Sequence, residues 1–307
     1  MRILFMGTPE FAVPSLKALL EAGHDVCGVF TQPDRPKNRG MKLIPSPVKE
    51  FALANKIPVF QPESLKQGDA FADISKLNPE LIVVAAYGRI LPRDILDFPP
   101  CGCINVHSSL LPKYRGAAPI HWAVINGDGA TGVTIMHMAQ ELDAGDIIDQ
   151  VSTPIDPEES VEAVHDRLAC LGGGLLVKVL SDLKAGTAKR TPQEHEKASY
   201  APMLTRALSP IDWNKPAIAI HNQIRGLTPW PATVTDNLSA QPVKVYQSKL
   251  TGEGTRKAPG AVVAAGKEGI DVACGDGSVL RLTQVQIQGS RRMSAADYVR
   301  GHPIEVS

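Results

Sequence analysis

Residues 81–87 have the sequence Leu-Ile-Val-Val-Ala-Ala-Tyr, an uninterrupted apolar run about as long as a typical strand. A strand with one face in water alternates apolar and polar residues, whereas a strand covered on both faces is apolar throughout. The run therefore predicts an inner strand of a parallel sheet with helices packed on both faces. It is far shorter than the ~20 apolar residues that span a bilayer, so no membrane association is expected.

Strands and helices alternate on both sides of this run. Strands are predicted at Ile3–Met6, Asp25–Thr31, Leu81–Tyr87, Cys103–His107 and Thr131–Met138. Helices are predicted, from apolar residues near helical spacing, at Phe11–Ala22, Pro47–Asn55, Asp69–Leu77 and Ala117–Asn126. This order predicts a Rossmann-like α/β domain with an open, mostly parallel sheet, in which ligands bind beyond the carboxyl ends of the strands.

Three successive glycines interrupt the next predicted helix, Glu159–Lys184. Each of Gly172, Gly173 and Gly174 costs a helix roughly 1 kcal/mol relative to alanine. The helix therefore either packs unusually close to a neighbour there or breaks, and the sequence leaves both possibilities open.

The remainder of the chain has a different pattern. A polar stretch follows Gly186, and a predicted helix at Pro216–Gly226 comes next. Short strands with glycine turns then predict a small antiparallel β-barrel, OB-like in type, at Val243–Leu250, Gly260–Ala265, Gly269–Cys274 and Ser278–Ile287. We expect a Rossmann-like domain over residues 1–186, a linker over 187–208 and the barrel over 209–307.

The charge and cysteine content narrow the class of protein. Basic and acidic residues number 32 each, but residues 206–307 hold 12 basic against 8 acidic ones, which favours an anionic partner for this part. The five cysteines are scattered and odd in number, and residues 1–7 resemble a buried strand rather than a signal peptide. We therefore expect a cytoplasmic protein. Zinc spacing and glycine-rich nucleotide loops are missing from the sequence, so neither a metal nor a nucleotide cofactor is expected.

Two polar residues stand at the end of the predicted strand Cys103–His107. Asn105 and His107 are two residues apart, so a strand places both side chains on one face. An acidic segment, Glu141–Asp146, follows another predicted strand and is therefore expected at the same edge of the sheet. A carboxylate from it can orient an imidazole or accept a proton. Spacing alone does not decide between Asp143 and Asp146.

The segment Asn105–Gly116, together with Asp143-Ala-Gly-Asp146, closely resembles the formyltransferase family that uses 10-formyltetrahydrofolate. Further segments are similar to the branch of that family that formylates methionyl-tRNA: Gly7–Ala12, Thr31–Val48 and Arg225–Pro231. The resemblance covers nearly the whole chain. It implies formyl transfer from 10-formyltetrahydrofolate to the α-amino group of initiator methionyl-tRNA, and nothing in the sequence indicates an obligate protein partner.

The resemblance also implies roles for individual residues. It makes Asn105 a donor to the reacting oxygen, His107 a second, charged donor, and Asp143 the group that orients His107 and accepts a proton. It implies folate contacts from two segments, with the residues Ser109, Leu110, Leu111, Pro112, Arg89, Ile90 and Leu91. It implies tRNA contacts from a basic loop, through Arg35, Arg39 and Lys42.

The C-terminal part supplies further basic residues that can meet a nucleic-acid backbone. These candidates are Lys244, Lys249, Arg256, Lys257, Lys267, Arg281, Arg291 and Arg292. Trp230 lies between two prolines, and we expect it to fill a core or hinge position rather than to stack on a nucleotide.

Two other functions compete with this interpretation. A formyl-folate transferase that acts on a sugar-nucleotide amine would share Asn105, His107 and Asp143. The basic loop around Pro33–Pro36 speaks against it, because a sugar nucleotide needs no arm that reaches an acceptor stem. A non-catalytic tRNA-binding module would be expected to lose the polar residues, all of which are present.

Overall fold

The protein consists of two compact units. The structure, a computed structural model, describes residues 1–37, 42–66 and 70–306, and for Lys37 and Lys42 the backbone alone. Unit 1 comprises residues 1–119, 131–153 and 165–201, and unit 2 comprises residues 120–130, 154–164 and 202–307. This grouping is not colinear, whereas the sequence predicted a colinear division. Most of the predicted linker, residues 187–201, belongs to unit 1.

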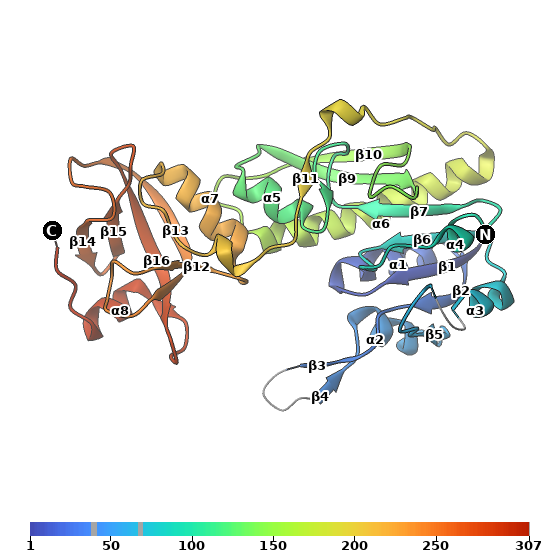
Figure 1. Ribbon diagram of the computed structural model, residues 1–307, viewed down its shortest axis with the longest axis horizontal. Helices are drawn as coiled ribbons and strands as arrows, with labels where there is room; N and C mark the ends of the chain where they lie inside the picture. The colour runs from blue at the N-terminus through green and yellow to red at the C-terminus, as the bar shows by residue number, and fades with distance from the viewer. Residues whose placement is uncertain (38–41, 67–69, 307) are drawn as a thin grey trace. The chain divides into compact units, whose positions relative to one another are not determined.

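Unit 1 contains a seven-stranded sheet with the order β10-β9-β7-β6-β1-β2-β5 (Figure 1). Its strands are β1 (Arg2–Gly7), β2 (Asp25–Phe30), β5 (Val59–Phe60), β6 (Leu81–Ala85), β7 (Cys103–His107), β9 (Ala130–His137) and β10 (Ile147–Pro154). The pairs β2–β5, β1–β2, β1–β6 and β6–β7 are parallel, which confirms the predicted mostly parallel sheet. β9 runs antiparallel to β7. β10 was not predicted, because the adjacent polar pairs Asp149-Gln150 and Ser152-Thr153 leave it neither a continuous apolar run nor a regular alternation.

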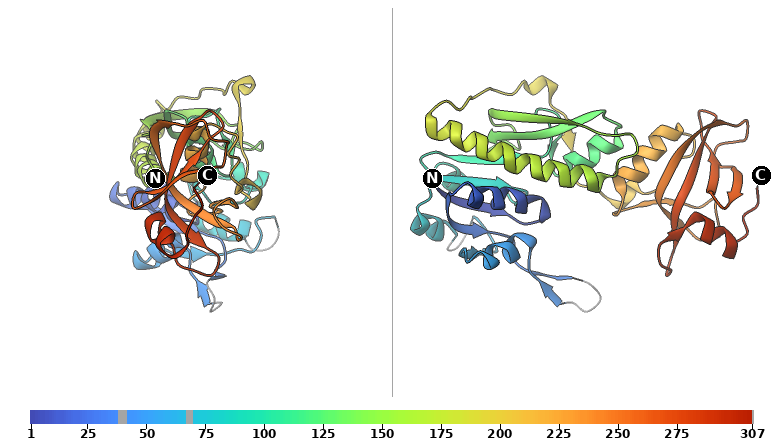
Figure 2. Two further views of the ribbon diagram at one scale, coloured as in Figure 1. Left: turned by 90° about the vertical axis from the view of Figure 1, so that its left-hand side faces the viewer. Right: turned by 180° about the vertical axis from the view of Figure 1, so that it is seen from behind.

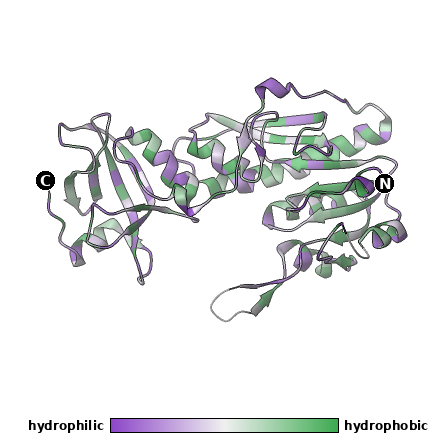
Figure 3. Ribbon diagram, in the orientation of Figure 1, coloured by the Kyte–Doolittle hydropathy of each residue, from purple (hydrophilic) through white to green (hydrophobic). Residues whose placement is uncertain are grey.

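Helices cover both faces of this sheet. The helices of unit 1 are α1 (Val13–Glu21), α2 (Pro47–Ala54), α3 (Ala70–Leu77), α4 (Arg93–Leu96), α6 (Val161–Ala185, from residue 165 on) and the short η1 (Glu10–Ala12) and η2 (His195–Lys197). α5 (Pro119–Ile125) belongs to unit 2 except for its first residue. Figure 2 shows α1 and α6 on one face. On the other, Ile74 of α3 and Ile95 of α4 share a core with Ile82 and Val84 of β6. In Figure 3 the central strands β1 and β6 are coloured as mainly hydrophobic, as expected for strands buried on both sides.

The three glycines of α6 leave the helix unbroken. A Cβ atom on Gly172 would lie 2.9 Å from a methyl carbon of Val106 in β7, and one on Gly173 would lie 2.9 Å from the carbonyl oxygen of Pro14. Two of the glycines therefore let α6 approach both the sheet and α1 closely, which decides between the two alternatives that the sequence left open.

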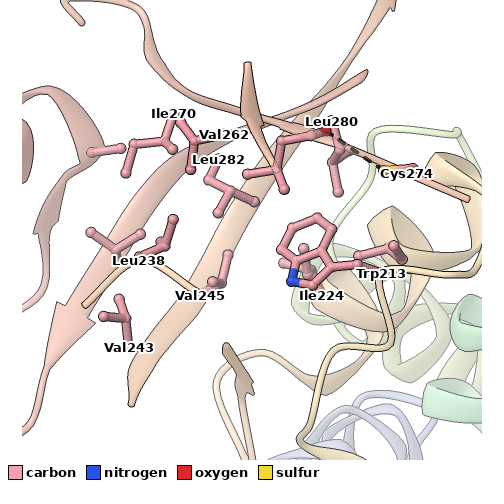
Figure 4. Packing of buried hydrophobic residues seen from close by; sticks show 14 of the residues in the cluster. Trp213, Ile224, Leu238, Val243, Val245, Val262, Ile270, Cys274, Leu280 and Leu282 are labelled. Atoms are coloured by element: carbon pink, nitrogen blue, oxygen red, sulfur yellow. Dashed lines mark hydrogen bonds between the residues drawn. The ribbon is translucent and has the colours of Figure 1, made fainter. Parts of the chain in front are cut away.

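Unit 2 is built on an antiparallel sheet with the order β12-β13-β16-β15-β14, and β17 pairs with β16. Its elements are η3 (Arg206–Leu208), α7 (Ala217–Leu227), β12 (Thr233–Thr235), β13 (Val243–Gly254), β14 (Val262–Gly266), β15 (Gly269–Ala273), β16 (Ser278–Ile287), β17 (Met293–Ser294) and α8 (Ala295–Gly301). Figure 4 shows side chains of the sheet packed in one core with Trp213, which precedes α7, and with Ile224 of α7. The predicted antiparallel domain is confirmed, although no pair joins β12 to β14 within residues 202–306.

Two small ribbons complete the description. β3 (Arg35–Lys37) and β4 (Lys42–Ile44) form an antiparallel pair. β8 (Arg115–Gly116) pairs in parallel with β11 (Tyr200–Ala201). Among the helices of the described residues, none is long and apolar enough to cross a membrane.

Candidate active site

The carboxyl ends of β6 and β7 meet at one edge of the unit 1 sheet. The two strands are parallel, with Val84 opposite Asn105. Side chains alternate between the faces of a strand, so Asn105, His107 and the core residue Cys103 share one face of β7, and Val106, which contacts α6, lies on the other. The predicted candidate residues therefore lie at the ligand-binding edge and on the face covered by α3 and α4.

The imidazole of His107 is buried and held by a backbone carbonyl. Its Nε2 lies 2.9 Å from the carbonyl oxygen of Tyr114, and since a carbonyl only accepts, Nε2 carries a proton and donates. Nδ1 faces Asp143, with 3.8 Å between Nδ1 and Oδ2. That distance is too long for a hydrogen bond but suits an ion pair with the imidazolium. The ring is thus oriented by Tyr114, whereas the sequence assigned this role to Asp143.

Asp143 reaches this site by a route that the sequence did not predict. The sequence predicts the acidic segment at this edge, since the segment after a parallel strand begins at the carboxyl edge of the sheet. β9 in fact runs antiparallel, and its last residue His137 lies opposite Ile104, near the start of β7. Residues 138–146 then turn back toward the site, where Asp143 Oδ2 accepts a hydrogen bond from the Gly116 N–H at 2.8 Å.

The two acids of this segment have different surroundings. Asp146 Oδ2 pairs with Arg190 Nε at 2.8 Å. Among the described residues, the Asp143 carboxylate has a hydrogen bond to Gly116 and an ion-pair contact with His107, both through Oδ2. Oδ1 of Asp143 is therefore the oxygen left to accept a further proton or hydrogen bond, and the structure favours Asp143 over Asp146.

Asn105 offers an uncommitted amide. Its side chain is half-buried on β7, and within the described part of the chain it makes no hydrogen bond. Buried amides are normally paired, so a half-buried free amide beside an ionisable pair is a natural contact for a ligand. Its donor group never titrates and can stabilise a developing negative charge at any physiological pH.

In the loop after β7, two of the predicted folate residues are buried and hydrogen-bonded to other residues of unit 1. The Ser109 hydroxyl is buried and donates to the carbonyl oxygen of Lys113 at 2.6 Å. Leu111 is also buried, and its N–H and carbonyl are bonded to Thr134 and Gln150. Of the four residues predicted to contact folate here, only Leu110 and Pro112 are half-exposed. The side chains of Ser109 and Leu111 are therefore packed within the loop, and their predicted contact with folate stays a prediction.

The predicted segment after β6 presents one conspicuous apolar side chain. Ile90 is 71% exposed, whereas Leu91 is buried in the core with Tyr87. The Arg89 guanidinium donates to the carbonyl oxygens of Pro62 and Glu63 at 3.1 and 2.5 Å, which ties this turn to a neighbouring loop. Burial raises the pKa of Tyr87, and among the described residues its hydroxyl has no hydrogen-bond partner.

The predicted tRNA-binding loop is partly described. Arg35 is exposed on β3, where its Nη2 donates to Gln32 Oε1 at 3.2 Å. The backbone of Lys42 belongs to β4, and Arg39 lies outside the described residues. The flanks of the loop thus form a hairpin, which the sequence did not predict.

In unit 2, one of the basic candidates is engaged in an ion pair, and others are exposed to solvent. Arg281 binds both oxygens of Asp271 at 2.7 and 2.9 Å and also contacts Glu268, and these carboxylates raise its pKa. It is therefore committed to a structural ion pair. Lys244 and Lys249 are exposed on β13, where register shifts after Val245 keep both on the solvent side. The side chain of Trp230 is 52% exposed, so the expected core position is wrong, and the hinge position stays a prediction.

The comparisons with known proteins bear directly on this geometry. The formyl transferase family matches residues 1–180, and the formyl transferase C-terminal domain matches residues 203–303. The chain belongs to the formyl transferase family. Within the described ranges no group of three or more His, Cys, Asp or Glu residues could hold a metal ion.

Curated relatives of this formyl transferase match it over almost its full length. A methionyl-tRNA formyltransferase from Trichlorobacter lovleyi is 50% identical over 99% of this chain and 95% of the relative. One from Moorella thermoacetica is 52% identical over 99% of this chain and 97% of the relative. Among solved structures, a sugar 3N-formyl transferase in the presence of dTDP and 5-N-formyl-THF has a TM-score of 0.69 at 20% identity, covering 95% of this chain and 99% of that one. At that identity the likeness concerns the fold alone.

Proposed function

We propose that the protein transfers a formyl group from 10-formyltetrahydrofolate to the α-amino group of initiator methionyl-tRNA, giving N-formylmethionyl-tRNA and tetrahydrofolate. The relatives that support this acceptor are about half identical over 99% of the chain. The observation that carries the chemistry is the free Asn105 amide on the same strand face as His107, whose Nδ1 lies 3.8 Å from Asp143. We infer a cytoplasmic location from the scattered, odd-numbered cysteines of the sequence.

The acceptor amine needs little help. An α-amino group titrates near pH ~8, and an ester neighbour lowers that value, so a useful neutral fraction exists in the cell. The demanding step is the formation of a tetrahedral oxyanion at the formyl carbon. The Asn105 amide is available to donate to this oxygen, and one such donor lowers the activation barrier by on the order of 3 kcal/mol.

The geometry gives His107 and Asp143 different roles in the proton transfers. Because the Nε2–H of His107 is occupied by the Tyr114 carbonyl, Nδ1 is the nitrogen available to gain or lose a proton. Asp143 Oδ2 faces Nδ1 across 3.8 Å, while Oδ1 is left to accept the proton that the amine loses, directly or through water. As the bond between the formyl carbon and N10 of the folate breaks, a proton must reach N10 to give tetrahydrofolate.

The segment after β6 fits a folate at its formyl-bearing end. The exposed Ile90 gives an apolar wall for a flat ring. The buried Tyr87 hydroxyl has no hydrogen-bond partner among the described residues, and a polar ligand atom would provide one. Folate would supply the activated formyl group. The residues of the chain supply the surface, the oxyanion donor and the proton acceptor.

A tRNA substrate requires basic surface, and both units have it. Arg35 lies exposed on the β3–β4 hairpin, to which Lys42 also belongs, and Arg39 is a further candidate of the same loop. In unit 2, Lys244 and Lys249 point outward from β13. Such contacts hold the phosphate backbone and carry no sequence information of their own.

A single assay separates this function from its nearest alternative. The protein is incubated with 10-formyltetrahydrofolate labelled in the formyl group and either methionyl-tRNA or a sugar-nucleotide amine. We expect label on methionyl-tRNA and at least ~100-fold less on the sugar amine, since hydrogen-bonding sites discriminate by that much or more. Label on the sugar amine alone would establish the alternative and reject our proposal.

A further inference from the structure

The segment 187–201, predicted as part of a linker, is joined to unit 1 at both of its ends. Thr191 and Ile147 exchange two backbone hydrogen bonds at 2.8 and 2.9 Å. Farther along, Arg115 N–H donates to the Ser199 carbonyl at 2.8 Å, next to the pairing of β8 with β11. Between these anchors lies Gln193, whose side chain is directed at the loop that carries Asp143.

The amide of Gln193 is fully used. Its Nε2 donates to the carbonyl oxygens of Asp143 at 2.9 Å and Gly145 at 2.8 Å. Its Oε1 accepts from Arg115 Nε at 3.1 Å and Nη2 at 2.8 Å. Arginine only donates, and carbonyls only accept. With the amide of Gln193 turned over, its NH2 group would face the Arg115 donors and its oxygen would face the two carbonyl oxygens, so the orientation described is the one that satisfies all four contacts. Gln193 is 5% exposed, so water does not easily replace these bonds.

Arg115 joins this amide to the carboxylate itself. Its side chain is 1% exposed, and it also lies 3.6 Å from Glu141 and 3.3 Å from His195 Nδ1. The next residue, Gly116, supplies the N–H that binds Asp143 Oδ2 at 2.8 Å. Two adjacent residues therefore act on Asp143, one on its carboxylate and the other, through Gln193, on its backbone.

The backbone of Asp143 needs such support. Its φ of 49° lies in the left-handed region, which is unfavourable for residues other than glycine and persists only when the surroundings hold it. The loop is also tightly folded, because a Cβ atom on Gly145 would lie 1.8 Å from the carbonyl oxygen of His137. The two hydrogen bonds from Gln193 go to the carbonyls of Asp143 and Gly145, so they hold the first and the last residue of this turn.

We propose that Gln193, which accepts two hydrogen bonds from Arg115, is a positioning residue for formyl transfer. It fixes the Asp143 backbone so that the carboxylate faces His107. The inference rests on the proposed function, since it requires Asp143 to act in the reaction. Gln193 does not touch the reacting atoms. Its effect on the rate must therefore pass through Asp143.

A double-mutant cycle tests this dependence. Gln193→Met removes the amide, and we expect kcat to fall roughly 10- to 100-fold with KM for methionyl-tRNA nearly unchanged. In an Asp143→Asn background the same substitution should change kcat by less than about twofold, because residues that act as one unit are not additive. Equal losses in both backgrounds, or an unchanged kcat in the Gln193→Met protein, would overturn the proposal.

Two further variants separate positioning from folding. Gln193→Glu keeps an acceptor for Arg115 but cannot donate to the two carbonyls, so a folded protein with the same loss of kcat is expected. The matched control is Gln223→Met, since Gln223 Nε2 also donates to two carbonyls, those of Leu208 at 2.8 Å and Pro210 at 3.0 Å, in unit 2. Its kcat should stay at the wild-type value, and an equal fall would show that Gln193 has no special role.

A crystal structure of the Gln193→Met protein gives a readout that does not depend on activity. We expect Asp143 to leave the Gly116 N–H or to change its left-handed backbone. An unmoved Asp143 would reject the positioning role even if the wild-type protein proved to formylate a different amine. A displaced Asp143 in a protein inactive on methionyl-tRNA would instead reject the proposed acceptor and keep the positioning role.

Discussion

Among the described residues, each unit buries one arginine, and the two arginines make the same kinds of hydrogen bond with different consequences. Arg115 of unit 1 donates to the amide oxygen of Gln193, and Arg225 of unit 2 donates to that of Asn222 at 2.9 Å. Arg225 also binds the carbonyl oxygens of Asp156 and Glu159 at 3.2 and 2.9 Å. Both fasten a remote segment of chain, but only the segment fastened by Arg115 contains a candidate reactive group.

The contrast shows that burial of a charge does not by itself mark an active site. Burial lowers the pKa of Arg225, yet its neighbours are backbone carbonyls and an amide that join α7 to residues 154–164 within unit 2. We interpret this network as structural. The network of Arg115 ends at a carboxylate that keeps one oxygen uncommitted, and that oxygen makes the difference.

The largest effect should come from the groups at the end of the Arg115 network. Alanine at Asn105, His107 or Asp143 is expected to lower kcat at saturating substrates by at least ~100-fold, because each removes an oxyanion donor or the proton acceptor. Single-turnover kinetics and circular dichroism would check rate and fold. Asp146→Ala is the matched control with a much smaller loss, and near-normal turnover in any of the three would remove that residue from the site.

The Arg225 network should respond in stability instead. Arg225→Met leaves two backbone carbonyls and the Asn222 amide without their donor, so we expect a loss of about 3 kcal/mol in the free energy of unfolding. Urea denaturation measures this loss, and Arg206→Met, at an exposed arginine of the same unit, should stay within about 0.5 kcal/mol. A fall in kcat per folded molecule like that expected for Gln193→Met would erase the contrast between the two units.

A more moderate effect is expected on the outer face of unit 2. The double substitution Lys244→Gln and Lys249→Gln should raise KM for methionyl-tRNA several-fold, leave kcat unchanged and reduce the slope of log affinity against log salt by about 2. Activity titrations over a range of salt concentrations provide the measurement. Lys17→Gln on α1 is the control, and an identical salt slope in the double variant would exclude both lysines as phosphate contacts.

The smallest expected effect is a pH dependence of stability beside Arg225. His221 is buried, and burial lowers its pKa below 6.5, with Arg225 lowering it further and Glu158 opposing this. The unfolded chain therefore binds the proton more readily, and the stability that is fully present above pH ~6.5 decreases as the pH falls below it. Urea midpoints at pH 8 and pH 5.5 should differ less in His221→Gln than in the wild type. An equal difference would assign the effect to other groups.

The sequence predicted the β-α-β half well because its signals are local. The run Leu81–Tyr87 is apolar throughout, and the structure places β6 between two parallel partners as that pattern requires. Asn105 and His107 share a face for the same reason, since alternation along a strand depends only on spacing. β10 was missed because its polar residues occur in adjacent pairs, so it has neither a continuous apolar run nor a regular alternation.

The rest depended on contacts between residues far apart in the chain. Whether Gly172 breaks or tightens α6 depends on Val106, and whether Arg281 is free for phosphate depends on Asp271. Neither partner is adjacent in sequence. Local spacing carries no information on which distant group will satisfy a charge or fill a gap.

The sequence by itself determined the strand-helix order, the family and the residues at the end of β7, because periodicity and motif are properties of neighbouring residues. Only the tertiary structure decided how Asp143 reaches His107. β9 runs antiparallel, the following loop turns back, and Gln193, fifty positions beyond Asp143, bonds to that loop. Strand direction and long-range hydrogen bonds are settled by packing of the whole unit, since the free energy of each such contact depends on distant partners brought together by folding.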